Sequence, residues 1–362
     1  MERIDVAVIG AGVTGLASAR AIAMRGHSVC LIERHGRPGL ETSTHNSGVI
    51  HAGLYYPAGT LKARLCVEGR RLLYELCAQH AVPHVKCGKL VVAHDAGEYD
   101  QLEALARRGE ANGVEGLELV DASFVNAREP AVSAVAALWS PESGVLDAES
   151  LVKTLLRSGA DAGVLFLPGT RLVGADRSAD GLVLHTDREA IHARVVVNAA
   201  GLYADDVSCV LGGETFRIYP CRGEYVELTP AKRALVNGLV YPLPSVHSLG
   251  VHIVKTTGGQ VWLGPTVCFQ ERKDDYEGGR LPVDAFVDPA RRLLRDITVD
   301  DLRLGGSGIR PKIHPPAEPF ADFMIRRDRE NPCVVQASGI ESPGLTACLA
   351  VGNLVESLVA ET

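Results

Sequence analysis

The sequence predicts an α/β fold with two domains, one built around a parallel sheet and one around an antiparallel sheet. Three observations lead to this prediction. Strand and helix patterns alternate over residues 4–32, short β-rich runs fill residues 216–264, and residues 334–359 return to a strand followed by an apolar helix. Alternation of strand and helix is typical of parallel sheets, whereas a series of short strands is typical of an antiparallel sheet.

Composition limits the classes of protein that fit. The 362 residues are 46% hydrophobic, which is enough to bury a large core, and the length favours two domains. The net charge of −7 provides no general attraction for nucleic acid or an anionic membrane, so we expect no nucleic-acid partner. The nine cysteines include no Cys-x-x-Cys pair, which argues against a metal site and a disulfide framework. Reduced thiols favour a cytoplasmic protein.

The first strand is expected at Ile4–Ile9. Gly10-Ala-Gly12-Val-Thr-Gly15 follows it directly, ahead of an alanine-rich helix over Leu16–Arg25. In this position G-x-G-x-x-G is typical of a Rossmann-like dinucleotide site. Its first glycine permits the tight turn, its second lets the backbone approach a pyrophosphate, and its third lets the helix pack closely on the strand. We therefore expect a dinucleotide at the start of this helix.

The second strand, Ser28–Ile32, ends at Glu33. This carboxylate lies roughly 20 residues beyond the glycines, where an acidic side chain binds ribose hydroxyls and repels a 2′-phosphate. NADP is thus disfavoured, and FAD and NAD stay as candidates.

The apolar stretch Val6–Met24 has the length of a secretory signal, but it contains the glycine turn and no basic segment precedes it. A cleaved signal is therefore not expected. No other run reaches the roughly 18 uninterrupted apolar residues of a spanning helix, so we expect no transmembrane segment. Peripheral contact with the inner face of a membrane stays open.

Two glycine-marked turns favour FAD over NAD. Asn198-Ala-Ala-Gly201 ends a predicted strand in small residues, as a strand does where a planar group passes over it. Gly339–Gly344 precedes an apolar helix over Leu345–Val359. A reduced flavin carries negative charge at its N1/O2 edge, which N–H groups at a helix start stabilise, and NAD needs no such group. The alternative is that these are ordinary turn glycines.

The segment Glu41–Tyr56 is rich in glycine and small polar residues, so it can run alongside a planar cofactor. Its His45-Asn-Ser-Gly-Val-Ile-His51 stretch resembles that of L-2-hydroxyglutarate dehydrogenases and oxidases, within the D-amino-acid-oxidase-like FAD superfamily. The resemblance continues through Leu61–Gly69 and Cys87–Val92 and covers nearly the whole chain. It implies FAD-dependent oxidation of a small L-2-hydroxy acid to the 2-oxo acid, with electrons passed to oxygen, a quinone or another carrier.

The remaining elements follow in order. Helices are expected at 62–80, 101–112 and 148–162. A hairpin-like stretch is expected between the second and the third of them. Strands are expected at 164–167, 171–175, 182–186, 193–198, 219–228, 239–243, 251–255, 260–263, 309–313, 324–327 and 334–338. We assign residues 1–85, 144–212 and 305–362 to the FAD-binding domain, and residues 86–143 and 213–304 to the substrate domain.

The motifs and the resemblance together give the candidate cofactor residues. Leu172 is placed by the resemblance alone, where a strand backbone meets the adenine. The candidates are Gly10, Gly12, Val13, Thr14, Gly15, Glu33, Arg34, Ser43, Thr44, Asn46, Ser47, Gly48, Val49, Leu172, Ala200, Gly201, Gly339, Ile340, Gly344, Leu345 and Thr346.

Four residues are candidates for the chemistry. Arg310 lies in Gly-Ile-Arg-Pro-Lys, and the resemblance implies that it binds the substrate carboxylate, for which a planar guanidinium offers two parallel hydrogen bonds. Lys312 shares its strand face and adds positive charge or is simply solvated. His51 is the candidate general base, because imidazole can accept the hydroxyl proton while the α-hydrogen leaves as hydride to flavin N5. A structural histidine and a flavin tether are the alternatives. His252 is a substrate contact or an alternate base.

Departures from the resemblance bear on the substrate. The sequence reads Thr44-His45-Asn46 where relatives have Gly-His-Asn, and Glu341 within Gly339–Gly344 is expected to disfavour a second carboxylate. Two other functions are weighed: an oxidase of amino acids or N-methyl amines on the same scaffold, which needs no strong base, and a flavoprotein without turnover. Hydrolase elbows, Walker loops and carboxylate pairs with metal-ligand spacing are absent from the sequence.

Overall fold

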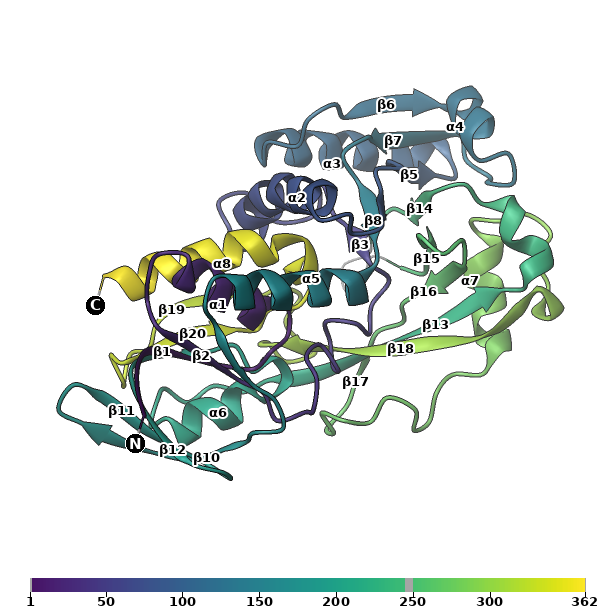
Figure 1. Ribbon diagram of the computed structural model, residues 1–362. Helices are drawn as coiled ribbons and strands as arrows, with labels where there is room; N and C mark the ends of the chain where they lie inside the picture. Colours follow the sequence, from purple (N-terminus) through teal and green to yellow (C-terminus); the bar gives the residue numbers. More distant parts are fainter. Residues whose placement is uncertain (1, 245–249, 362) are drawn as a thin grey trace.

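The computed structural model describes residues 2–244 and 250–361, which form two large sheets and their covering helices (Figure 1). The first sheet has the order β10-β11-β12-β1-β2-β9, with β20 paired to both β12 and β19. Its centre is parallel and its margin from β12 to β10 is antiparallel. The strands are β1 Glu2–Ile9, β2 Val29–Ile32, β9 Leu165–Leu167, β10 Leu172–Ser178, β11 Gly181–Thr186, β12 Ala190–Asn198, β19 Met324–Arg327 and β20 Val334–Ser338.

Four helices pack together over one face of this sheet, namely α1 (Val13–Ala23), α2 (Leu61–Gln79), α5 (Ala148–Asp161) and α8 (Gly344–Ala360) (Figure 1). The crossing of α1 and α8 is close enough to require a glycine. A Cβ added at Gly352 would lie 2.7 Å from the carbonyl oxygen of Ala17. The C-terminal helix is thereby held directly against the helix that begins at the glycine turn.

The second sheet has the order β17-β13-β16-β15-β14-β5-β7-β6, with β18 paired to β13. Its strand pairs are antiparallel except for β5 with β14. The strands are β5 Lys89–Ala93, β6 Glu118–Asp121, β7 Ala136–Ser140, β13 Tyr219–Leu228, β14 Leu239–Pro242, β15 His252–Lys255, β16 Val261–Gly264, β17 Cys268–Phe269 and β18 Leu302–Lys312. The predicted α/β class with a second, mainly antiparallel sheet is confirmed.

Smaller elements join the two sheets. A short sheet, in the order β3-β8-β4, links the loop after the first βαβ unit to the chain entering α5. The remaining elements are β3 Val49–Ile50, β4 His84–Val85, β8 Gly144–Leu146, α3 Tyr99–Ala111, α4 Ala122–Arg128, α6 Ala204–Val210 and α7 Val287–Arg291, with short 3₁₀ turns at Ala96–Glu98, Gly201–Tyr203, Pro230–Leu235, Val283–Phe286 and Val299–Asp301. None of the described helices is both long and apolar enough to cross a membrane.

Three expectations about elements need correction. The first helix begins at Val13 rather than Leu16, because the helix already starts inside the glycine motif. The hairpin-like stretch does pair β6 with β7, but α4 lies between them, capped by Asp121, whose side chain accepts from the Phe124 N–H. The strand expected at 309–313 starts at Leu302, since its glycine-rich first half pairs along β13 without side-chain alternation to reveal it.

Candidate functional site

Two adjoining cavities lie at the carboxyl ends of β1 and β2 and between the two sheets. The smaller, of about 380 Å³, lies beside the ends of β1 and β2, and the larger, of about 750 Å³, extends toward β13, β15 and β18. Both are lined by Gly12, Thr42, Ser43, Ala199 and Gly201, so one elongated ligand can occupy both.

The glycine turn is shaped for close approach. Gly10 has φ +100°, and a Cβ there would lie 2.6 Å from the Ala199 carbonyl oxygen. The N-cap of α1 is Gly12, which has no side chain to cover the first turn. Helix starts without a capping side chain present N–H groups and positive dipole ends to anions. The turn therefore fits the pyrophosphate of a dinucleotide.

The smaller cavity suits the adenosine end of such a ligand. Glu33 ends β2 and its carboxylate accepts from the Ala11 N–H at 2.8 Å and from the His35 N–H at 2.8 Å. It thus ties the glycine turn to the strand end as well as lining the cavity. Arg34 lies on the Tyr203 ring, 3.6 Å from its centroid, and Leu172 lines the same cavity.

Most predicted cofactor residues line one of the cavities. They are Gly10, Gly12, Val13, Thr14, Glu33, Arg34, Ser43, Asn46, Ser47, Val49, Leu172, Ala200, Gly201, Ile340, Gly344 and Leu345. Five others lie behind the walls: Gly15, Thr44, Gly48, Gly339 and Thr346.

The residues behind the walls hold the lining in place. The Thr44 hydroxyl donates to the Gly39 carbonyl at 2.6 Å. The Thr346 hydroxyl lies between two segments, accepting from the His51 N–H at 3.0 Å and donating to the Val49 carbonyl at 3.3 Å. The predicted cofactor residues therefore include some that support the cavity lining from behind.

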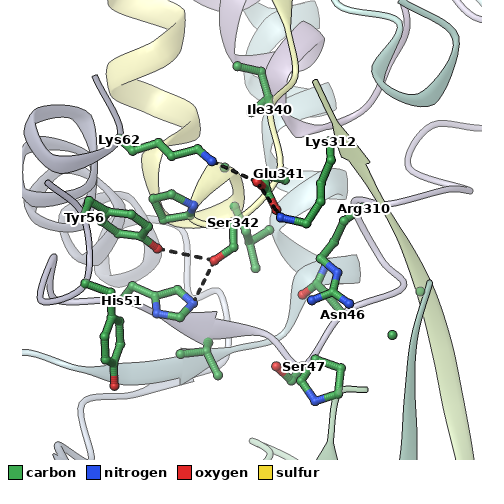
Figure 2. A pocket seen from close by; sticks show the side chains of 18 of the residues that line it. Asn46, Ser47, His51, Tyr56, Lys62, Arg310, Lys312, Ile340, Glu341 and Ser342 are labelled. Carbon is green, nitrogen blue, oxygen red and sulfur yellow. Dashed lines mark hydrogen bonds and ion pairs between the residues drawn. The ribbon is translucent and has the colours of Figure 1, made fainter. Parts of the chain in front are cut away.

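His51 is half-buried in the wall of the larger cavity, directly after β3. Its Nε2 lies 3.4 Å from the Ser342 hydroxyl, which in turn lies 3.4 Å from the Tyr56 hydroxyl (Figure 2). Burial, with smaller contributions from Lys89 and His252, lowers the pKa of His51 well below its usual range. The imidazole is therefore unprotonated at neutral pH, as a general base must be.

Arg310 enters the same cavity from β18. Its guanidinium donates to the carbonyls of Cys221 at 3.3 Å, Arg222 at 3.3 Å and Thr266 at 2.7 Å, which fix its orientation. Within the described ranges no carboxylate forms an ion pair with it. Its charge is thus free to bind a carboxylate that enters the cavity.

Comparison with known proteins also indicates a dinucleotide cofactor. Residues 5–358 match the family model DAO, described as FAD dependent oxidoreductase. The chain belongs to this family. FAD is therefore the cofactor of this oxidoreductase, in agreement with the shape of the glycine turn.

The relatives of the oxidoreductase include two mitochondrial L-2-hydroxyglutarate dehydrogenases. The Arabidopsis thaliana protein is 37% identical, over 97% of this chain and 82% of its own length. The Homo sapiens protein is 36% identical, over 75% of this chain and 62% of its own length, so the match leaves out more than a third of the human protein.

Solved structures share the fold. The L-α-glycerophosphate oxidase of Mycoplasma pneumoniae with FAD bound matches with a TM-score of 0.91 and 27% identity, covering 99% of this chain and 95% of that one. The glycine oxidase of Geobacillus kaustophilus matches with a TM-score of 0.84 and 23% identity, covering 100% and 96%.

Two lysines of the oxidoreductase converge on Glu341 in the cavity wall. Lys62 Nζ lies 2.9 Å from one carboxylate oxygen and Lys312 Nζ lies 2.9 Å from the other (Figure 2). Burial raises the pKa of Glu341, but the two ammonium groups outweigh it and hold the pKa at about 2. The triad as a whole is therefore cationic, which argues against the expectation that Glu341 disfavours a second carboxylate.

Replacing Glu341 with glutamine should destabilise the fold by about 3 kcal/mol at pH 7, because the buried Lys62 and the half-buried Lys312 lose their anionic partner. The folded pKa of Glu341, about 2, lies below the unfolded value of roughly 4.3, so this stability is present above pH 4.3. It is lost as the pH falls toward 2. Denaturant unfolding of both proteins at pH 7 and pH 3 measures the difference, which should shrink at the lower pH.

The matched control is Glu149→Gln, which removes the exposed pair between Glu149 and Arg37. Exposed pairs contribute about 1 kcal/mol or less, so this variant should unfold almost as the unsubstituted protein does. Equal losses for the two variants would contradict the structural importance of the triad.

His252 and Lys89 lie in the second sheet beside the larger cavity. His252 stacks on Tyr241 at 3.8 Å between ring centroids, and its Nδ1–H donates to the Gly250 carbonyl at 3.1 Å. Burial lowers its pKa to about 3. Lys89 is fully buried, and burial lowers its pKa to about 7.

Sequence reasoning missed three residues in and beside this site, Lys62, Lys89 and Ser342, and also the ion pairs of Glu341 with two lysines. The resemblance includes Lys62 and Lys89, but no local pattern separates either from a solvated lysine. Three tyrosines, Tyr55, Tyr56 and Tyr241, line the cavity, whereas Trp262 is outside its lining.

Proposed function

We propose that the enzyme oxidises a small L-2-hydroxy acid, L-2-hydroxyglutarate, to the 2-oxo acid. The observation that carries the proposal is an unprotonated His51 in the same cavity as Arg310, whose charge no carboxylate of the described residues neutralises. The charge of the residues that line the cavity supports a dianion as substrate. Among the lining residues Lys62, Arg108, Arg310 and Lys312 are cationic, and only Glu341 is anionic. The names of the relatives match this substrate.

In this reaction each side chain has a separate task. Arg310 binds the carboxylate next to the reacting carbon through two parallel N–H groups, and its three carbonyl partners keep the guanidinium plane fixed. His51 accepts the proton of the hydroxyl group at Nε2, the nitrogen that faces Ser342. The Lys62–Glu341–Lys312 triad leaves a positive charge in the wall for the second carboxylate.

The residues that would hold FAD come from both ends of the chain. The backbone of Gly10–Gly15 would hold the pyrophosphate, Glu33 the ribose, and Ser43, Ser47 and the start of α8 the flavin end. When bound, FAD supplies the hydride acceptor for the α-hydrogen.

The test is anaerobic mixing of the FAD-loaded protein with candidate substrates, followed through the flavin absorbance near 450 nm. L-2-Hydroxyglutarate should bleach the flavin within seconds, and D-2-hydroxyglutarate, glycine, sarcosine and glycerol 3-phosphate should not. Bleaching by an amine alone would establish the amino-acid oxidase alternative. Bound flavin that no hydroxy or amino acid bleaches would establish a flavoprotein without turnover.

The reaction also needs an electron acceptor, for which oxygen, a quinone and another carrier are the chemical classes. Admitting air to the bleached sample tells oxygen from the other two, because only an oxidase regains its absorbance quickly. We propose a cytoplasmic location, since all nine cysteines are free thiols. A quinone acceptor would favour contact with the inner face of a membrane, which fractionation of cells would detect.

A further inference from the structure

Lys89 is a buried cation without a hydrogen-bonding partner. It begins β5, its side chain has no exposed surface, and its Nζ makes no hydrogen bond within the described residues. The ammonium group instead lies over two aromatic rings, 4.1 Å from the centroid of Tyr241 and 5.3 Å from that of Tyr55. Burying an ammonium without an anion is unfavourable, so its presence here calls for a function.

The tyrosine rings connect Lys89 with the proposed reaction centre. Tyr55 and Tyr241 both line the larger cavity, and the Tyr241 ring also stacks on the imidazole of His252. Lys89, Tyr241 and His252 therefore form a layered arrangement that ends at the cavity. After burial, the charges of Lys89 and His252 also lower the pKa of His51.

The titratable groups that act on Lys89 or lie beside it come from several elements. They are the Cys66 thiol of α2, the Cys87 thiol, the phenols of Tyr55 and Tyr241, His51 and His252, with Arg310 acting on His252 from β18. Glu129 acts on the Cys87 thiol but forms no ion pair with Lys89 within residues 2–244 and 250–361. No carboxylate in that region neutralises Lys89 directly.

We propose that Lys89 is a positioning residue whose buried ammonium group holds His51 and His252 in their unprotonated forms. The inference depends on the proposed function only in treating His51 as the catalytic base. A proton added to either imidazole would create a second positive charge in the same dry region, and like charges at short range oppose each other. Lys89 thereby keeps the base available below pH 6.5, where a free imidazole is protonated.

The direct test is a titration of the histidines in the FAD-loaded protein by NMR with ¹³C-labelled imidazoles. His51→Asn and His252→Asn assign the two signals. In the unsubstituted protein both should remain unprotonated from pH 8 down to pH 4.5. In Lys89→Met, which keeps the chain length without the charge, the pKa of each should rise by about two pH units or more, into this range.

Two comparisons separate charge from packing. Lys89→Arg keeps a positive charge and should keep both imidazoles unprotonated. Lys255→Met removes another lysine of the same sheet, whose Nζ donates to the Val236 carbonyl at 2.7 Å, and should leave both signals unchanged. Lys89→Gln serves as the uncharged variant if Lys89→Met does not fold.

Histidines that stay unprotonated to pH 4.5 in the uncharged variant would overturn the proposal, since burial alone would then suffice. The NMR result does not depend on turnover. If no 2-hydroxy acid bleaches the flavin, the proposed substrate fails while the role of Lys89 is still decided. If bleaching occurs, the acidic limb of its pH profile should move to higher pH in Lys89→Met and not in Lys89→Arg.

Discussion

Arg310→Ala should raise the dissociation constant for L-2-hydroxyglutarate by about 100-fold, because two charge-assisted hydrogen bonds and an unneutralised cation are lost together. The FAD content should not change, since Arg310 bonds to carbonyls of the second sheet and its neighbourhood rather than to the glycine turn. Anaerobic titration of flavin bleaching against substrate concentration measures the effect.

Two variants of β18 sharpen this measurement. Arg310→Lys keeps a charge but not the planar pair of donors, so it should recover only part of the affinity. Arg303→Ala removes an arginine of the same strand that pairs with Glu227 at 3.0 Å outside the cavity. It should leave the affinity unchanged. Equal losses in Arg303→Ala and Arg310→Ala would mean that the strand, rather than the guanidinium, determines binding.

His51→Asn should slow anaerobic bleaching by L-2-hydroxyglutarate by about 10²- to 10⁴-fold, the usual contribution of a positioned general base. In the unsubstituted enzyme the rate should stay high below pH 6.5, because the pKa of His51 lies below its usual range and only the unprotonated imidazole accepts the proton. Stopped-flow measurement of the bleaching rate from pH 5 to pH 8 tests both points.

His94→Asn is the matched control for this variant. His94 is a half-buried histidine beside the second sheet, and its Nδ1 contacts the Ser133 carbonyl at 3.0 Å. Its substitution should leave the rate unchanged. A His51 variant that retains the full rate would remove the base from the mechanism and favour an amine substrate, which loses hydride from a neutral nitrogen compound without such a base.

The parts of the fold that local pattern determines were predictable. The strands at 219–228, 324–327 and 334–338 have the expected bounds. The glycine motif and Glu33 likewise predicted the smaller cavity. The domain boundaries at 85/86, 143/144, 212/213 and 304/305 stay predictions.

The rest depends on contacts between distant residues. Lys62 and Glu341 are 279 positions apart, and no sequence pattern near either residue predicts the ion pair. Lys89 begins an apolar strand, where a lysine usually marks a solvated end. Only the packing of β14 and its tyrosine against β5 shows that it is buried. Charge placement in this enzyme is a property of the assembled sheets.

The hydroxyl of Thr346 has a consequence for the order in which the enzyme is made. It accepts from the backbone N–H of His51, across 295 positions of the chain. During synthesis the glycine turn and His51 leave the ribosome long before α8 exists, so the nascent chain can form its first strands without a finished reaction centre. Catalytic competence should therefore appear only after the last helix emerges and packs against α1 and α2.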